Sequence, residues 1–368
     1  MPVFGQFEEV LLSDFPRLGS ETADNGRIKR WLDAGHRAVH RWAGVLEIAS
    51  PGILEHRPRD IRGVRGTQGN AITGTTLVPV GKWDKSESVL TFTSATQFLT
   101  GLNIQVAVKD GLAEDDPGHG LVFRKCHGSQ IKDVTVYGLW AGVDPESNAS
   151  KRRWRGAQRA AVYTDYFNSG TLSNIRVRNV GGIGVLLTQT NGLRADLYVI
   201  VSNGDGIVVW SGRPHPWTIY PGASESGSGL ELRAHCEGLD GWALRCQNSH
   251  QGTLLGGYFE RTEGGIWLAG SRNWSLRMPR AGRKPLRLTG SSWDTHIDWL
   301  VGNGSFEYPD GVKKYSPIEL GYYWSKTEGG QVRVPVPKSW ISGLDNARYS
   351  STVGHNIRPD IVRLPSDM

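Results

Sequence analysis

The chain has 368 residues, with 48 glycines, 14 tryptophans, three cysteines and a formal charge of +6. Three cysteines are too few for a disulfide-held scaffold, and no Cys/His cluster with metal-ligand spacing is present, so we expect neither a metal site nor a cofactor. No apolar run approaches the roughly 18 residues of a membrane span, and the opening MPVFGQFEEV lacks the regions of a signal peptide, so we expect no membrane insertion.

The first hundred residues are expected to hold a short leading segment and then a helix. Residues 1–20 are interpreted as an amino-terminal segment that serves in attachment, and residues 21–100 as a capping helix with the first strands. The sequence DNGRIKRWLDAGHRAVHRW predicts an amphipathic helix that Asp24 or Asn25 caps. Such a helix would cover the open end of a solenoid. Its apolar face would comprise Ile28, Trp31, Leu32, Val39 and Trp42.

Residues 101–301 alternate short Gly-led apolar strands with a second set of apolar strands. The first set includes GIGVLL, GIVVW, GWALRC and GIWLAG, and the second includes GLRADLYVIV, GLELRAHCEG and GTLLGGYFE. The second set recurs about every 22 residues, a period typical of one rung of a solenoid. We therefore predict an all-β chain: a single-stranded right-handed parallel β-helix, forming one elongated domain.

Two longer intervals interrupt this period. The segments from Asp144 to Arg159 and from Ser211 to Gly227 each follow a Gly-led strand, so they are expected to project from similar corners of nearby coils. Aromatic rings pack on sugars and guanidinium groups pair with carboxylates, so the loops could wall a groove for an acidic polysaccharide; the alternative is that they pack against a neighbouring subunit. The candidate binding residues are Arg153, Trp154, Arg155, Trp210, Arg213, His215, Trp217 and Tyr220.

The sequence changes character after about Gly302. Residues 302–368 are richer in Pro and Tyr, and their strands lack the rung period. We interpret this region as an irregular carboxy-terminal extension that acts as a cap or as a subunit contact.

Three stretches of the first hundred residues carry a family resemblance. TADNGRIKRWLDAG, then GVLEIASPGIL, then IRGVRGTQGNAITGTTLVPV, followed by the rungs, resembles the opening of the pectate-lyase-like tailspike proteins of bacteriophages, which have the pectin lyase fold. The resemblance covers residues 18 to 300. Within the rungs, GGYFERTEGGIWLAG is similar to the aromatic pair and Glu that precede a Gly-led strand in this group, which implies a role for Glu260.

Cleavage of a glycan by hydrolysis normally needs two carboxyl groups, one protonated and one ionised. Besides Glu260, the candidates are Glu263, Asp205 and Asp165, with Glu231, Glu237 and Asp240 on preceding rungs. A solvent-exposed corner residue is the alternative for each of them. Hydrolase and lyase chemistry are not separated by the sequence, because Arg, Lys, His and Tyr are available for both.

The resemblance implies a virion-borne tailspike or tail-fibre protein that binds a bacterial surface polysaccharide, and it leaves open whether the protein also depolymerises that polysaccharide. Its expected partners are an anionic glycan, two further copies in a homotrimer and other virion proteins, after assembly in the host cytoplasm. One alternative is a non-catalytic β-helical decoration protein, and a third is a bacterial polysaccharide lyase or glycoside hydrolase. We expect no nucleic-acid binding, because the basic residues alternate along many strands without a recognised module.

Overall fold

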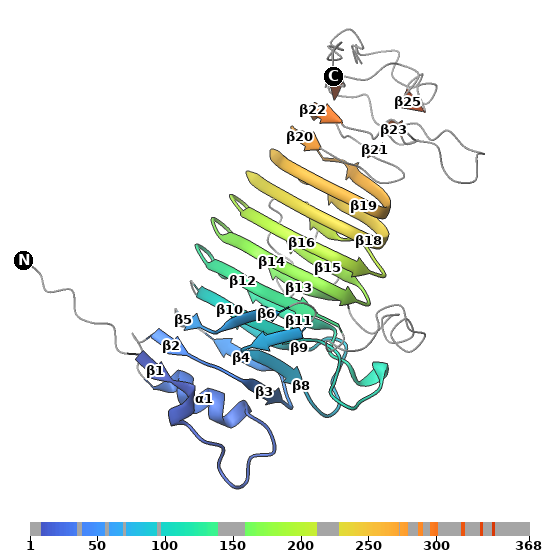
Figure 1. Cartoon of the computed structure of the whole chain (residues 1–368). Helices are drawn as coiled ribbons and strands as arrows, with labels where there is room; N and C mark the ends of the chain where they lie inside the picture. The colour runs from blue at the N-terminus through green and yellow to red at the C-terminus, as the bar shows by residue number, and fades with distance from the viewer. Residues whose placement is uncertain are drawn as a thin grey trace, which may run out of the picture. The chain divides into compact units, whose positions relative to one another are not determined.

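The computed structural model describes residues 9–34, 39–55, 59–68, 71–93, 97–138, 159–211, 228–271, 273–278, 286–289, 295–300, 318–320, 332–333 and 341–342. The chain divides into two compact units, Met1–Gly182 and Ile183–Met368. Both are built from parallel strands, which Figure 1 labels along the chain. The prediction of an all-β chain folded as a parallel β-helix is therefore confirmed.

The first unit contains one α-helix, two 3-10 helices and fourteen strands among its described residues. The helices are η1 (Leu12–Asp14), α1 (Asn25–Asp33) and η2 (Ala113–Asp115). The strands are β1 (Glu9–Leu11), β2 (Val39–Arg41), β3 (Val45–Ile48), β4 (Gly52–Glu55), β5 (Arg59–Arg62), β6 (Arg65–Gln68), β7 (Ala71–Gly74), β8 (Thr76–Pro79), β9 (Ser88–Thr93), β10 (Gln97–Gln105), β11 (His119–Arg124), β12 (Gln130–Tyr137), β13 (Ala160–Asp165) and β14 (Thr171–Val180).

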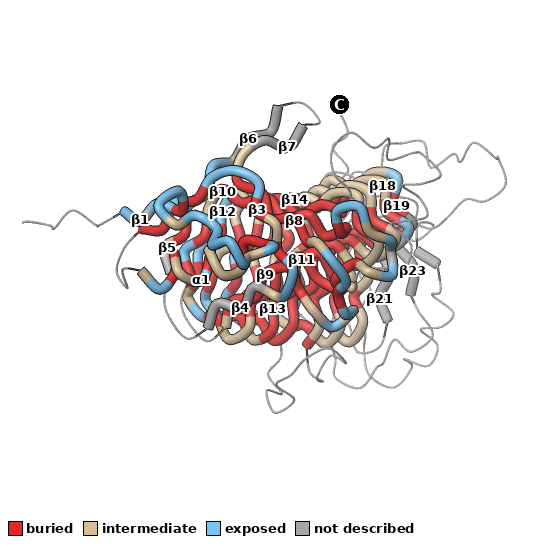
Figure 2. Tube along the Cα trace, turned by 90° about the horizontal axis from the view of Figure 1, so that it is seen from below, coloured by how far each residue is buried: buried red, intermediate tan, exposed pale blue. Residues whose placement is uncertain are grey.

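Parallel ladders connect these strands through residues far apart in the sequence. Strand β9 pairs with β11 and β11 with β13, while β10 pairs with β12 and β12 with β14. Side chains of one ladder stack along it, as Phe92 does on Phe123 with ring centroids 5.3 Å apart. Figure 2 shows the buried positions concentrated in strands such as β8, β9, β11 and β13. The core of this unit therefore lies inside the coils, between the β9–β11–β13 ladder and the β10–β12–β14 ladder. Among the described strands of this unit, the hairpin β6–β7 pairs antiparallel.

Helix α1 is shorter than the sequence predicted. It ends at Asp33 with an extended Ala34, and Val39 belongs to β2, which pairs in parallel with β1 and β5. Ladder pairing satisfies the backbone of this segment, so the amphipathic pattern beyond Asp33 reports burial and not a continuing helix. The apolar face still forms, because Trp31 stacks on Trp42 with centroids 5.2 Å apart and its Nε1 donates to the Val10 carbonyl at 2.9 Å.

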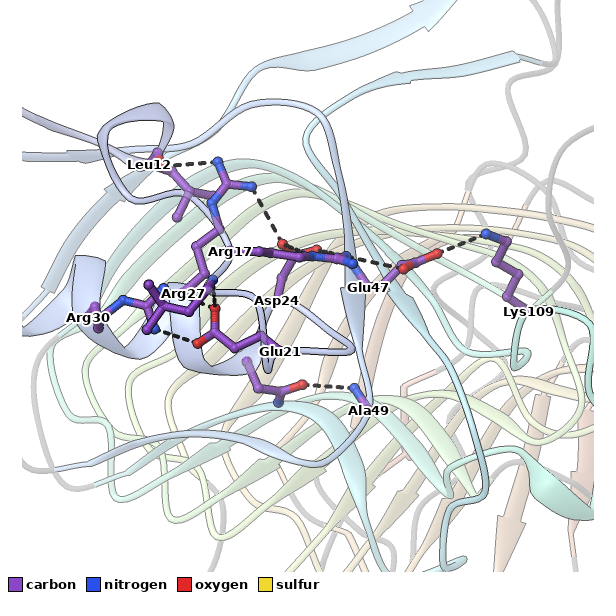
Figure 3. A network of polar contacts seen from close by, with 11 residues as sticks. Leu12, Arg17, Glu21, Asp24, Arg27, Arg30, Glu47, Ala49 and Lys109 are labelled. Atoms are coloured by element: carbon purple, nitrogen blue, oxygen red, sulfur yellow. Dashed lines mark hydrogen bonds and ion pairs between the residues drawn. The ribbon is translucent and has the colours of Figure 1, made fainter.

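The predicted cap of α1 is also corrected. Asp24 is the residue before the helix, but its side chain makes no capping hydrogen bond. Instead its carboxylate accepts from Arg17 Nη2 at 2.6 Å and from the Glu47 backbone N at 2.7 Å. Figure 3 shows this network, in which Glu47 also pairs with Arg17 and with Lys109. The acidic residue thus joins the start of the helix to strand β3 and does not cap it.

The second unit contains the strands β15 (Ile183–Thr188), β16 (Arg194–Ser202), β17 (Ile207–Trp210), β18 (Leu230–Gln247), β19 (Gly252–Ala269), β20 (Ser275–Met278), β21 (Leu286–Thr289), β22 (Thr295–Leu300), β23 (Ile318–Leu320), β24 (Val332–Arg333) and β25 (Ile341–Ser342). Leu230 pairs with Gly252, 22 positions later, whereas Arg194 pairs with Glu231, 37 positions later. The longer interval spans one of the two predicted loops.

Strands β23, β24 and β25 lie in the segment that was expected to be irregular. They pair in parallel with β21, β22 and β23, respectively. At these three places the coils therefore continue beyond residue 302.

The sequence predicted GLELRAHCEG and GWALRC as two separate strands. In the structure they form the single strand β18, which bends at a corner without ending. The turn uses left-handed residues at equivalent positions of three strands: Val201 (φ 59°), Gly238 (φ 66°) and Arg261 (φ 51°). The left-handed residue bends the strand, while the residues on either side of it keep their ladder partners. The same device occurs in the first unit, where Asn174 donates to Asp133 at 2.6 Å and both have φ 54°.

Val201 is the unfavourable member of this corner, because a β-branched residue is strained at positive φ. Among the residues that the structure describes, Asn174, Asn179, Asn248 and Asn273 adopt the same conformation. We expect Val201→Asn to raise the free energy of unfolding by about 1 kcal/mol, measured by urea denaturation. Ile200→Asn, one residue earlier in the strand, is the control and should not stabilise. A Val201→Asn variant that is less stable than wild type would contradict the backbone strain that we infer at Val201.

Candidate functional site

Three partly exposed aromatic rings line one face of the second unit. Tyr198 of β16, His235 of β18 and Tyr258 of β19 occupy the same ladder position on three successive strands. Their ring centroids are 5.8 Å apart between Tyr198 and His235 and 4.7 Å apart between His235 and Tyr258. Buried neighbours such as Leu197 and Cys236 point the other way, so the rings form a continuous outward stack.

Two carboxyl groups lie next to these rings. Glu237 and Glu260 pair directly across β18 and β19, two residues beyond His235 and Tyr258. The Tyr258 hydroxyl donates a hydrogen bond to Glu260 Oε2, and His235 Nε2 lies 3.9 Å from Glu237 Oε2. We call these five side chains, Tyr198, His235, Tyr258, Glu237 and Glu260, the ring–carboxylate face.

The arrangement is unfavourable for the fold taken alone. Like charges directly opposite each other on neighbouring strands destabilise a sheet. No Lys or Arg among the described residues forms an ion pair with Glu237. The two carboxyl groups also have different neighbours, a phenol hydroxyl on one and an imidazole near the other. Such differences in environment are what allow two carboxyl groups to take separate acid and base roles.

Asp205, one of the predicted catalytic residues, has a structural role at the corner. Its Oδ1 accepts from the Trp242 backbone N at 2.8 Å, and its Oδ2 lies 3.4 Å from Arg245 Nη1. Arg245 in turn stacks over the Trp267 ring, 4.4 Å from its centroid. Asp205 thus anchors the stretch of β18 that follows the bend.

The other predicted carboxylates are placed differently from Glu260. Glu263 follows Glu260 in β19, and its side chain lies outside the described residues. Asp165 ends β13 of the first unit and is fully buried. Parallel pairing thus places Glu237 next to Glu260. Glu237 was one of the several carboxylates that the sequence suggested on preceding rungs.

Trp210 does not share a strand segment with Glu260. It ends β17 and pairs with Gln247, whereas Glu260 pairs with Glu237, ten positions earlier in β18 and before the bend. The predicted groove residues of the two long loops lie outside the described part of the chain: Arg153, Trp154, Arg155, Arg213, His215, Trp217 and Tyr220.

Sequence reasoning did not single out Tyr198, His235 and Tyr258. Each of these residues stands at an outward position, three residues before the left-handed corner residue of its strand. The unequal intervals, 37 and then 22 residues, concealed the alignment.

In the described ranges no group of three or more His, Cys, Asp or Glu side chains is arranged to hold a metal ion. Over those ranges, no helix combines the length and the apolar character needed to cross a bilayer.

No protein-family model matches the chain, and no curated protein matches it. Among solved structures, the chain is similar to the catalytic domain of a GH87 alpha-1,3-glucanase in complex with tetrasaccharides, with 11% sequence identity and a TM-score of 0.47. The match covers 88% of this chain and 52% of the other, so the chain spans about half the length of the protein that it matches.

Proposed function

We propose that this protein binds a polysaccharide on the ring–carboxylate face and hydrolyses it with Glu237 and Glu260. The observation that supports the proposal is the stack of three outward rings beside two directly opposed carboxyl groups. Aromatic faces pack against the apolar faces of sugar rings, and a glycosidic bond is cleaved between two carboxyl groups. One face would therefore bind the glycan and cleave it.

The spacing of the strands favours a retaining reaction. Neighbouring strands lie about 4.8 Å apart, close to the roughly 5 to 5.5 Å between the carboxyl groups of retaining enzymes. In this reaction Glu260, oriented by Tyr258, attacks the anomeric carbon, while Glu237 protonates the departing glycosidic oxygen. Water then hydrolyses the glycosyl ester as Glu237 takes up the proton. The net reaction adds one water molecule to each cleaved bond.

The biological setting that we propose is host adsorption by a bacteriophage tailspike. The support is the resemblance of the amino-terminal sequence to that family. In this setting the chain forms a homotrimer on the virion, together with other virion proteins, and multivalent display strengthens weak binding to a bacterial surface glycan. The activity is tested by incubating the protein with capsular and lipopolysaccharide fractions. New reducing ends without unsaturated sugars support hydrolysis, and unsaturated products would indicate a lyase.

Tyr198 tests binding separately from cleavage, because it lies in the ring stack two strands from Glu260. We expect Tyr198→Ala to weaken glycan binding about five- to tenfold, in line with the contribution of one aromatic contact. Tyr198→Phe should retain the wild-type affinity. The matched control is Phe98→Ala, which removes an exposed ring (41%) from the other unit. Equal losses in Tyr198→Ala and Phe98→Ala, measured by affinity electrophoresis, would count against this face.

A further inference from the structure

A β-bulge interrupts the ladder beside the ring–carboxylate face. Leu232 pairs with Leu254 but Arg233 pairs with Gly256, so Leu255 is an extra residue in β19. Leu255 is 41% exposed. Bulges occur often next to functional sites, where they redirect side chains. Here the bulge sets the register that places Tyr258 against His235 and Gly256 beside Arg233.

Gly256 leaves open space next to Arg233. A Cβ built on Gly256 meets no atom within 4 Å, and its φ lies outside the left-handed region, so the backbone does not require glycine there. In contrast, a Cβ on Gly257 would meet Phe259 at 2.9 Å. Gly256 is the register partner of Arg233 and follows the bulged Leu255, and we call the open surface at Gly256 the notch.

Arg233 is an exposed cation at the edge of this notch. Within the described residues its guanidinium forms no hydrogen bond or ion pair, although Asp196 is its register partner on β16. On the same strands, Arg194 already pairs with Glu231 at 3.2 Å, and Arg245 lies 3.4 Å from Asp205. An unpaired guanidinium offers a planar pair of donors that matches a carboxylate.

We propose that Arg233 and the notch bind a carboxylate carried by a sugar of the polysaccharide, which makes the ligand an acidic glycan. This inference rests on the proposed function. Arg233 lies four residues before Glu237, about 13 Å along the strand, so the carboxylated sugar and the cleaved bond belong to different residues of one glycan chain. The separation also keeps the sugar carboxylate away from Glu237 and Glu260, which would repel it.

The test compares acidic glycans with their carboxyl-reduced forms. The probes are a panel of polyuronates and acidic capsular polysaccharides, each paired with its neutral derivative, and affinity is measured by titration calorimetry. We expect Arg233→Gln to weaken binding of the acidic form about tenfold and to leave the reduced form unchanged. Gly256→Val should have the same effect, because it fills the notch without a backbone clash.

Arg178→Gln is the matched control, because Arg178 belongs to β14 of the first unit, outside the ring–carboxylate face, and its loss changes the net charge equally. Circular dichroism checks that every variant is folded. Equal affinity of the wild type for acidic and reduced forms would overturn the carboxylate subsite and leave the proposed function standing. Equal losses in Arg178→Gln and Arg233→Gln would likewise overturn it. Binding of neither form would overturn both proposals.

Discussion

Glu260→Gln is expected to abolish most glycan cleavage while the protein still binds its substrate. Replacing one of two essential carboxyl groups should lower the rate about 100- to 10,000-fold, because general acid–base groups contribute on this scale. Glu237→Gln should cause a loss of similar size. The measurement is the release of reducing ends from the glycan that the wild type cleaves, with affinity measured in parallel.

The two variants should differ in rescue. If Glu260 is the nucleophile, azide takes the place of its carboxylate in Glu260→Ala and forms a glycosyl azide with inverted anomeric configuration. In Glu237→Gln, azide instead attacks the glycosyl ester on Glu260 and forms a glycosyl azide with retained configuration. Glu231→Gln is the control on the same strand, because Glu231 is paired with Arg194 and lies six residues from Glu237. Unchanged cleavage in both Glu237→Gln and Glu260→Gln would leave this face as a binding surface only.

Asp24→Ala is expected to lower the free energy of unfolding of the first unit by about 2 to 3 kcal/mol, because it removes hydrogen bonds to a buried carboxylate. Asp24 is 2% exposed, and its loss leaves the Glu47 backbone N without its acceptor and removes one of the two carboxylates that Arg17 contacts. The measurement is urea denaturation at pH 7, followed by circular dichroism. Glu9→Gln is the control, because it removes an exposed ion pair with Arg41 and should cost less than about 1 kcal/mol.

The same carboxylate predicts acid sensitivity. Burial alone would raise the pKa of Asp24, but hydrogen bonds from Arg17 and the Glu47 backbone hold it below its usual value. A lowered pKa in the folded state contributes stability above the unfolded pKa of about 3.9, and this contribution disappears as pH falls through the folded pKa. Wild type should therefore lose stability below about pH 4 more steeply than Asp24→Ala. Parallel pH profiles would show that Asp24 is not linked to folding.

The sequence by itself determined the strand repeat, since coils that stack must place apolar residues at alternate positions and small residues at tight approaches. GIVVW and GLRADLYVIV, for example, correspond to β17 and β16. It also determined the buried face of α1, because Ile28, Trp31 and Leu32 recur at helical spacing. These patterns depend on residues close together in the sequence, so they can be predicted from the sequence alone.

Only the tertiary structure decided which outward residues meet. Tyr198, His235 and Tyr258 come together because ladder pairing skips 37 residues once and 22 the next time, and no local rule sets those intervals. The bulge at Leu255 similarly shifts Gly256 beside Arg233. Register depends on the loops and corners between strands, so the partner of Glu260 was fixed by stacking and not by neighbouring sequence.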